Sequence, residues 1–376
     1  MDALRRNGSL SRVEIARLSG LTPQAIRNIV DDLLQTNLIR ETGRRKGFRG
    51  QPQINIEINP DGGYSLGFHA EAGILHHVAA NLGGQIVYEG KSLPIPRSKA
   101  DMLETIAEID AKSQHELKGL MRLGVGAVFS RPASSKWFIH EQSPEEFAAQ
   151  SQALAGYFDE EIVFENDANA AALAESMFGL VRAGGNFVYI FVGEGVGGGI
   201  VDAGEPVRGV RGNAGEFGHI LIDPNGEKCH CGNNGCLHGY LSIGGLRRKY
   251  KDVSLEPSSV PDEWINSAAS ALGRALVSLE NILDPERVIV GGTAPEWLLA
   301  EIVSRLARQD FPSVRSELAE QRLEISKLGS RSALLGAAAL SLLNVTNPSL
   351  AKLTKQSFSL DDIVATPRVN ANVKSS

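Results

Sequence analysis

The sequence predicts an α/β fold in which a small helical head precedes a body of two α/β lobes. The 376 residues exceed the size of an average single domain, so two or three domains are expected. Residues 1–60 carry ten Lys/Arg and six Asp/Glu, whereas the rest of the chain carries 28 basic and 38 acidic residues. Beyond residue 60, short apolar runs alternate with helical patterns, as they do in covered sheets. We therefore expect a basic head that meets a polyanion and an acidic body that does not.

The composition excludes several other classes of protein. Apolar residues make up 42% and charged residues 22%, which is ordinary for a globular chain and disfavours disordered, collagen-like and coiled-coil proteins. The apolar run 333–343 is too short to cross a membrane, and residues 1–6 lack the apolar core of a signal peptide. Three cysteines do not make a disulfide framework. These features predict a soluble protein of the reducing cytoplasm with no membrane segment.

The head begins with two capped helices. Ser11 and Glu14 form a capping box that opens a helix reaching about Leu18, and Gly20 supplies the turn after it. The second helix starts at Thr22-Pro23, with threonine as the N-cap and proline at the first helical position. Its apolar residues fall at helical spacing and predict one buried face, made of Ile26, Ile29, Val30, Leu33 and Leu34.

The other side of the second helix and the segment after it carry the candidate DNA contacts. Two strand-like runs, 38–42 and 53–58, flank the basic, glycine-rich stretch 43–52, which suits phosphates or a minor groove. The order of helix, turn, helix and basic hairpin is typical of a winged helix-turn-helix over 1–60. The alternatives are a structural helical cap and an RNA contact. The expected DNA contacts are Thr22, Gln24, Arg27, Asn28, Arg44, Arg45, Lys46, Arg49 and Gln51.

The body divides into two predicted lobes, 61–168 and 169–345. Strands are expected at 63–70, 75–82, 85–88, 123–129, 162–164, 187–192 and 287–290. Helices are expected at 99–118, 170–177, 263–283 and 332–343. The last of these helices is expected to pack back on the first lobe. The tail 346–376 loses its apolar periodicity, so we expect it to be poorly ordered.

Two glycine-rich segments follow predicted strands, at 193–199 and 291–293. Backbone amides in such loops can approach an anion closely, so they are candidate phosphate cradles. Glycine also serves plain tight turns, and that alternative stays open.

The cysteine cluster is the sharpest local motif. Cys229, Cys231 and Cys236 lie within eight residues, with turn-forming Gly and Asn between them, which suits one tetrahedral zinc ion. The candidates for the fourth ligand are His219, His230 and His238. His230 lies between two ligating cysteines, where ring closure would be strained, whereas His219 can fold back across a turn. The alternative is a set of free thiols or a lost metal site.

Several motifs of the body together resemble those of a known family. Gly215-Glu216-Phe217-Gly218-His219, followed by Cys-x-Cys-Gly-Asn-x-Gly-Cys, is similar to the signature of the ROK family of repressors, open reading frames and kinases. With Glu165–Asn169, Gly195–Gly199, Val290–Gly292 and the head, the resemblance spans about 1–345. The arrangement looks like that of the family's xylose and N-acetylglucosamine repressors.

The resemblance implies a two-lobed, actin-like sugar kinase fold of the ribonuclease H-like type, with a sugar in the cleft. It implies that zinc is held by His219, Cys229, Cys231 and Cys236. It implies that the sugar hydroxyls are met by Asn166, Asp167, Glu216 and His219. Kinase members use the aspartate at position 167 as the general base on the attacking hydroxyl.

Two departures from the family pattern bear on function. Kinases of the family carry Asp-x-Gly-Gly-Thr after the first strand, but here His69 replaces the aspartate and Glu71 replaces a glycine. A carboxylate there repels phosphates, so we expect no kinase activity and a vestigial role for Asp167. His238 stands where the family has a sugar-binding glutamate. It predicts a different sugar, a sugar acid or a phosphorylated ligand, unless the substitution is harmless.

The sequence thus predicts a sugar-responsive transcriptional regulator, most simply a repressor of carbohydrate-utilisation genes. The head would bind a palindromic operator as a homodimer or homotetramer. A carbohydrate bound between the lobes, with His238 among its contacts, would change the spacing of two heads, and Zn²⁺ would be structural. The alternatives are an ATP-dependent sugar kinase and a structural module whose head contacts protein.

Overall fold

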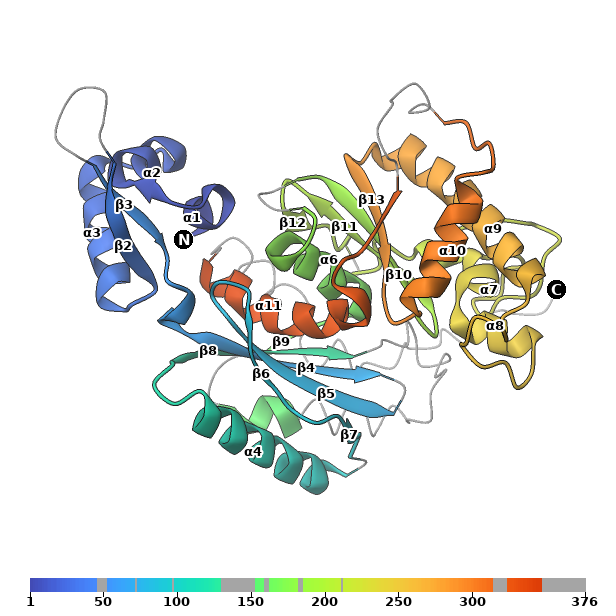
Figure 1. Cartoon of the computed structure of the whole chain (residues 1–376), viewed down its shortest axis with the longest axis horizontal. Helices are drawn as coiled ribbons and strands as arrows, with labels where there is room; N and C mark the ends of the chain where they lie inside the picture. Colours follow the sequence, from blue (N-terminus) through green and yellow to red (C-terminus); the bar gives the residue numbers. More distant parts are fainter. Residues whose placement is uncertain are drawn as a thin grey trace, which may run out of the picture.

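The computed structural model places a small head beside a body built on two sheets (Figure 1). It describes residues 1–45, 53–71, 73–96, 98–129, 153–158, 162–181, 185–210, 212–313 and 323–346. The predicted tail lies outside these residues from 347 onward.

The head is a winged helix-turn-helix, as predicted. Its helices are α1 (Asp2–Asn7), α2 (Arg12–Ser19) and α3 (Pro23–Gln35), and its strands are β1 (Leu10–Ser11), β2 (Ile39–Arg45) and β3 (Gln53–Ile58), in the sheet order β1-β3-β2. The capping box at Ser11 and the Thr22 cap are both formed. One prediction is wrong: Ile29 is 43% exposed. The head is so small that α3 buries only the narrow strip of Ile26 and Val30, four residues apart.

Both sheets of the body share one topology. The first runs β6 (Ile86–Glu89), β5 (Ile74–Asn81), β4 (Tyr64–Glu71), β8 (Arg122–Phe129) and β9 (Ile162–Glu165), with β7 (Leu93–Pro94) paired to β5. The second runs β12 (Glu205–Pro206), β11 (Val196–Asp202), β10 (Phe187–Val192), β13 (Arg287–Gly291) and β14 (Leu323–Ile325). In each, an antiparallel three-strand meander precedes two strands parallel to its first. The body is therefore a structural duplication.

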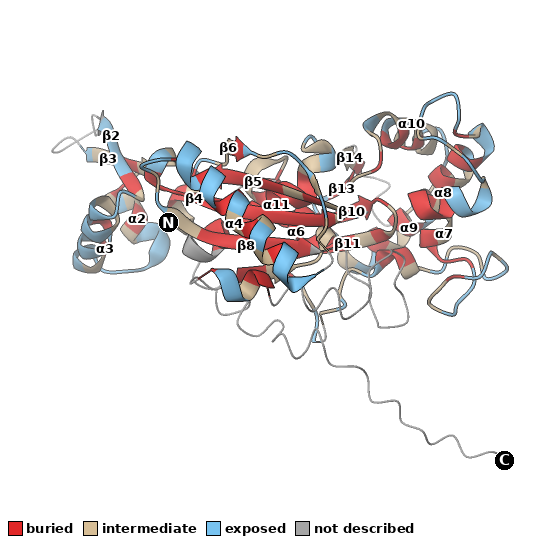
Figure 2. Ribbon diagram, turned by 90° about the horizontal axis from the view of Figure 1, so that it is seen from below, coloured by how far each residue is buried: buried red, intermediate tan, exposed pale blue. Residues whose placement is uncertain are grey.

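Helices cover these sheets on both faces. α4 (Lys99–Glu116) packs on one face of the first sheet through Met102 and Ile106. α9 (Asp262–Leu283) and α10 (Glu296–Leu306) pack on one face of the second sheet, in one apolar cluster with residues of α7 (Leu237–Leu241) and α8 (Ile243–Lys249). The remaining faces meet α6 (Asp167–Phe178) and α11 (Ser332–Thr346), which lie side by side between the sheets (Figure 1). The strands, this helix pair and the inner sides of α7, α8 and α9 are buried (Figure 2).

Glycines in the first sheet let α11 approach closely. A Cβ atom on Gly67 would lie 2.5 Å from the amide nitrogen of Ala338, and one on Gly126 would lie 1.9 Å from the carbonyl oxygen of Ala337. Helix 332–346, far from these strands in the sequence, therefore rests directly on the first lobe.

This contact predicts a large cost for a single methyl group. We expect Gly126→Ala to lower the free energy of unfolding by about 1–3 kcal/mol, because the helix must move away from the strand. Urea denaturation followed by circular dichroism measures it. Gly156→Ala is the control, since a Cβ there meets no atom within 4 Å. Equal stabilities for the two variants would contradict the packing argument.

The head joins the body through a short, packed segment. Asn59 donates its side-chain amide to the carbonyl oxygen of Asn37, and residues 60–62 form a single helical turn. Leu38 and Ile58 of the head pack against a buried apolar cluster formed by β5, Leu82 and α11. The head is thus held against the first lobe. Among the described residues, no helix has both the length and the apolar character needed to span a membrane.

Candidate metal centre and ligand site

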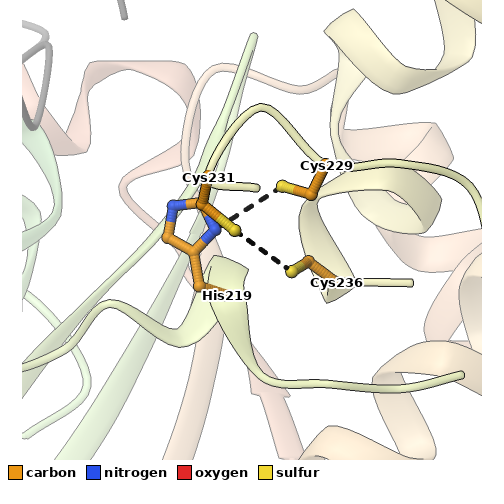
Figure 3. A group of neighbouring side chains, drawn as sticks. All are labelled: His219, Cys229, Cys231 and Cys236. Atoms are coloured by element: carbon orange, nitrogen blue, oxygen red, sulfur yellow. Dashed lines mark hydrogen bonds between the residues drawn. The ribbon is translucent and has the colours of Figure 1, made fainter. Parts of the chain in front are cut away.

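Four side chains converge between the second sheet and α7 (Figure 3). His219 ends a short helical turn at 217–219, Cys229 and Cys231 come from the following loop, and Cys236 is the N-cap of α7. Their ligand atoms all lie within 4.8 Å of one another. Glycines at 232 and 235 have positive φ, which lets the loop turn back on itself. The cluster can hold a metal ion.

The donor set and spacing fit tetrahedral zinc. Cys231 Sγ and Cys236 Sγ lie 3.6 Å apart, and Cys229 Sγ lies 3.7 Å from His219 Nδ1. Neighbouring sulfur ligands of a zinc ion with Zn–S bonds of about 2.3 Å are about 3.8 Å apart. Of the three candidate histidines, His219 belongs to the group of converging side chains that could hold a metal ion, and His230 and His238 do not.

His238 extends this cluster toward the second sheet. Its ring is nearly parallel to that of His219, with centroids 6.3 Å apart, and it is only 3% exposed. Burial, and then the charge of His230, lower the pKa of His238 to about 3, so the ring is neutral. Its Nε2 has no hydrogen-bond partner among the described residues, and its Cε1 lies 3.5 Å from where a Cβ on Gly195 would be.

Asn166 and Asp167 form the N-terminus of α6. The Asn166 side-chain oxygen accepts from the Asn169 amide at 2.8 Å, which leaves its side-chain NH₂ as the group able to meet a ligand. Asp167 is partly buried and accepts from the Ala168 amide. Glu216 is exposed and occupies the N-cap position of the turn that carries His219, without a capping hydrogen bond from its side chain. The described contacts do not join Asn166 and Asp167 directly to the His219 group.

Loop 193–195 faces Glu71 at one end and His238 at the other. Glu71 accepts a hydrogen bond from Thr293 Oγ1 at 2.7 Å, and both lie against Gly193. Burial raises the pKa of Glu71 to about 7, the Thr293 hydrogen bond opposes the shift, and the charge of Asp167 adds to it. Asp167 and Glu71 therefore share one electrostatic environment.

The expected phosphate cradles have another structural role. Residues 196–199 belong to β11, and their glycines admit close neighbours: a Cβ on Gly198 would lie 2.0 Å from Phe217, and one on Gly199 would lie 2.7 Å from Ala172. A Cβ on Gly292 would lie 2.4 Å from the Val192 carbonyl oxygen. His69, which replaces the kinase aspartate, is buried, and burial followed by His76 lowers its pKa to about 3.

The candidate DNA contacts are described only in part. Thr22, Gln24, Arg27 and Asn28 are all exposed on the N-terminal half of α3, which lies on the outer side of the head (Figure 1). Arg44 and Arg45 lie in β2, but their side chains are not described. Lys46, Arg49 and Gln51 lie outside the described residues.

Comparison with known proteins settles the family. Residues 72–343 match the ROK family, and residues 1–40 match the winged helix-turn-helix DNA-binding family. The chain belongs to the ROK family. It is 27% identical over 369 residues to the putative xylose repressor of a Caldicellulosiruptor species, covering 88% of this chain and 91% of that protein.

Two solved structures of ROK proteins have folds similar to that of this chain. A ROK family transcriptional regulator, described as a homologue of the E. coli MLC protein, superposes with a TM-score of 0.70 at 25% identity and covers 96% of both chains. The ROK hexokinase of Thermus thermophilus gives a TM-score of 0.60 at 25% identity, covering 76% of this chain and 99% of its own. The winged head on an actin-like sugar kinase body is thus the observed fold, as predicted.

Two interacting pairs of side chains near the candidate ligand site were not predicted from the sequence. Thr293 and the bond it makes to Glu71 have no local signature, because 222 residues separate them. Arg208 and Glu165 form a buried ion pair at 2.7 Å, 10% and 4% exposed. Glu165 also accepts from the Asn166 amide, so the pair ties the loop leading to Glu216 to the start of α6. The glutamate before Asn166-Asp167 was the only available signal.

Proposed function

We propose that this ROK protein is a sugar-responsive DNA-binding regulator, a repressor of carbohydrate-utilisation genes. The observation that carries the proposal is a winged helix-turn-helix, with an exposed polar face on α3, packed on a sugar kinase body. The name of the Caldicellulosiruptor relative supports repression and a sugar effector. A regulator of chromosomal genes acts in the cytoplasm.

Each part of the chain has a role in this proposal. Residues 1–60 bind an operator through α3 and the wing, as a homodimer or homotetramer on a two-fold site. The lobes, 61–168 and 169–345, hold the carbohydrate between them. Its expected contacts are Asn166, Asp167, Glu216, His219 and His238.

Helix α6 offers a physical route between the two sites. Its N-terminus carries Asp167, and Phe178 at its C-terminus packs on the cluster that also contacts Leu38 and Ile58 of the head. A Cβ on Gly84 would lie 2.4 Å from the Phe178 ring, so this end of the helix has little room to move independently. A ligand that favours one position of α6 would therefore bias the head, provided it binds the two states unequally.

Zinc fits the proposal as a structural ion. His219, Cys229, Cys231 and Cys236 would hold it, and it would fix to the body the loop that runs between Glu216 and His238. Kinase activity is not part of the proposal. The neutral His69 offers no charge to a metal–phosphate complex, and Glu71 would repel phosphates.

Asp167→Asn tests the effector site. We expect the sugar response to be lost, because the amide removes an acceptor for sugar hydroxyls, whereas operator affinity without sugar changes by less than about twofold. Fluorescence anisotropy on the DNA upstream of the gene, at fixed salt, measures both, with D-xylose, D-glucose, N-acetyl-D-glucosamine and their phosphates. Asp202→Asn, at the exposed end of β11, is the matched control. A wild-type response in Asp167→Asn would refute this site, and ATP turnover dependent on Asp167 would favour the kinase.

A further inference from the structure

One hydrogen bond joins the two lobes beside the proposed effector site. Glu71 is the last residue of β4 in the first sheet, and Thr293 follows β13 in the second. The Thr293 hydroxyl donates to Glu71 Oε1 at 2.7 Å. Because the partners belong to different sheets, this bond constrains the separation of the lobes.

The backbone around the bond is shaped to admit it. A Cβ on Gly193, which follows β10, would lie 2.6 Å from Thr293 Oγ1 and 3.2 Å from Glu71 Oε1. The ends of β4, β10 and β13 therefore meet at this point, and only glycine at 193 leaves room for both partners. Loop 193–195 is itself anchored, since the Ile243 amide donates to the Gly193 carbonyl oxygen at 2.9 Å and the Gly244 amide donates to the Glu194 carbonyl oxygen at 3.1 Å.

The bond is close enough to both groups of proposed ligand contacts to be related to each of them. On one side, the charge of Asp167 acts on Glu71. On the other, Gly195 at the end of the same loop faces His238, which stacks on His219. A ligand can contact both groups at once only if the groups are held at a fixed separation, and holding them there in advance lowers the cost of binding.

We propose that Glu71 and Thr293 are positioning residues of the effector site. Their hydrogen bond holds the lobes at the separation that lets Asp167 and the His219–His238 pair contact the same carbohydrate. The carboxyl group of Glu71 thus links the first lobe to Thr293 of the second lobe. This inference rests on the proposed function for the identity of the ligand, but the link between the lobes can be tested without any ligand.

The first experiment measures the separation of the lobes in the full chain. Spin labels are attached to p-acetylphenylalanine introduced at the exposed positions Lys112 and Arg308, one in each lobe, so that the cysteines stay unlabelled. We expect a single narrow distance distribution for the parent chain and a broader or shifted one for Thr293→Val. Thr293→Ser keeps the hydroxyl, and Glu71→Gln keeps an acceptor oxygen, so both should retain the narrow distribution. An unchanged distribution in Thr293→Val overturns the proposal.

The second experiment measures the consequence for the ligand. The concentration of D-xylose, D-glucose or N-acetyl-D-glucosamine that releases operator DNA is compared across the same variants. Thr293→Val should need about three- to tenfold more of the active sugar, the value of one hydrogen bond, whereas Thr293→Ser should match the parent. Equal sugar requirements in both variants overturn the positioning role. If no sugar acts on the parent chain, the proposed function fails on its own, and the distance measurement still decides the link between the lobes.

Discussion

Cys231→Ser is expected to abolish both metal binding and the response to sugar. Cys231 Sγ lies 3.6 Å from Cys236 Sγ, and its removal leaves three ligands for an ion that requires four in a structural site. Loss of a residue that only supports a zinc ligand weakens binding by about 10–100-fold, so loss of a ligand should weaken it further. The zinc content of the purified protein, measured by inductively coupled plasma mass spectrometry, should fall from one zinc per chain to nearly none.

The sugar response should disappear with the metal for a mechanical reason. The loop between His219 and Cys236 contains little regular secondary structure. Two isolated β-bridges pair Leu221 with Cys236 and Lys228 with Asn234. Without the ion, this loop no longer fixes His238 against Gly195. Operator binding without sugar should persist, since the head folds around its own apolar cluster.

His230→Asn provides the matched control. His230 lies beside two ligating cysteines, and its Nδ1 is 4.0 Å from Cys229 Sγ, yet the four converging ligand atoms do not include it. We expect His230→Asn to keep one zinc per chain and His219→Asn to lose it. Retention of zinc in His219→Asn, with loss in His230→Asn, would reverse the assignment of the fourth ligand.

Arg27→Ala is expected to remove most of the operator affinity. Arg27 is exposed on the N-terminal half of α3, the part of a recognition helix that meets base edges. Each arginine that contacts a base or phosphate contributes about 1–3 kcal/mol, and a dimer loses it twice. The dissociation constant should rise by about 30-fold or more, and the dependence of affinity on salt should become shallower if the contact is to phosphate.

The control removes the same charge from the body. Arg308 is an exposed residue of the second lobe just after α10, and its guanidinium group donates to Ser304 Oγ, so Arg308→Ala is the control. Its operator affinity should stay within about twofold of the parent value, because a distant surface charge is screened at physiological salt. Equal losses in the two variants would mean that α3 is not the recognition helix and that binding reflects overall charge.

Local structure was predictable where neighbouring residues decide it. The capping box of Ser11 and Glu14 and the Thr22-Pro23 start follow from contacts within a few residues. The strands β4, β5, β6, β8, β9, β10 and β13 follow from local apolar runs, whereas the short strands β7, β12 and β14 and the glycine-rich β11 were not predicted. The Cys229–Cys236 spacing predicted a metal site, because thiolates that close in sequence can surround one ion without help from the rest of the chain. Segment 196–199 was misinterpreted as a loop, since glycine that admits a neighbouring helix has the same composition as glycine that cradles an anion.

The head, the alternating body, the family signature and, through the family resemblance, the four candidate metal residues could all be predicted from the sequence. The structure shows that His219 and the three cysteines converge, how α11 returns to the first sheet, and how Glu71 meets Thr293 across the lobes. The reason is the range of the forces involved. Capping, periodicity and turn formation depend on residues a few positions apart, so the local sequence predicts them. The packing of α11 on Gly67 and Gly126, and the bond between Glu71 and Thr293, depend on how two separately folded sheets come together.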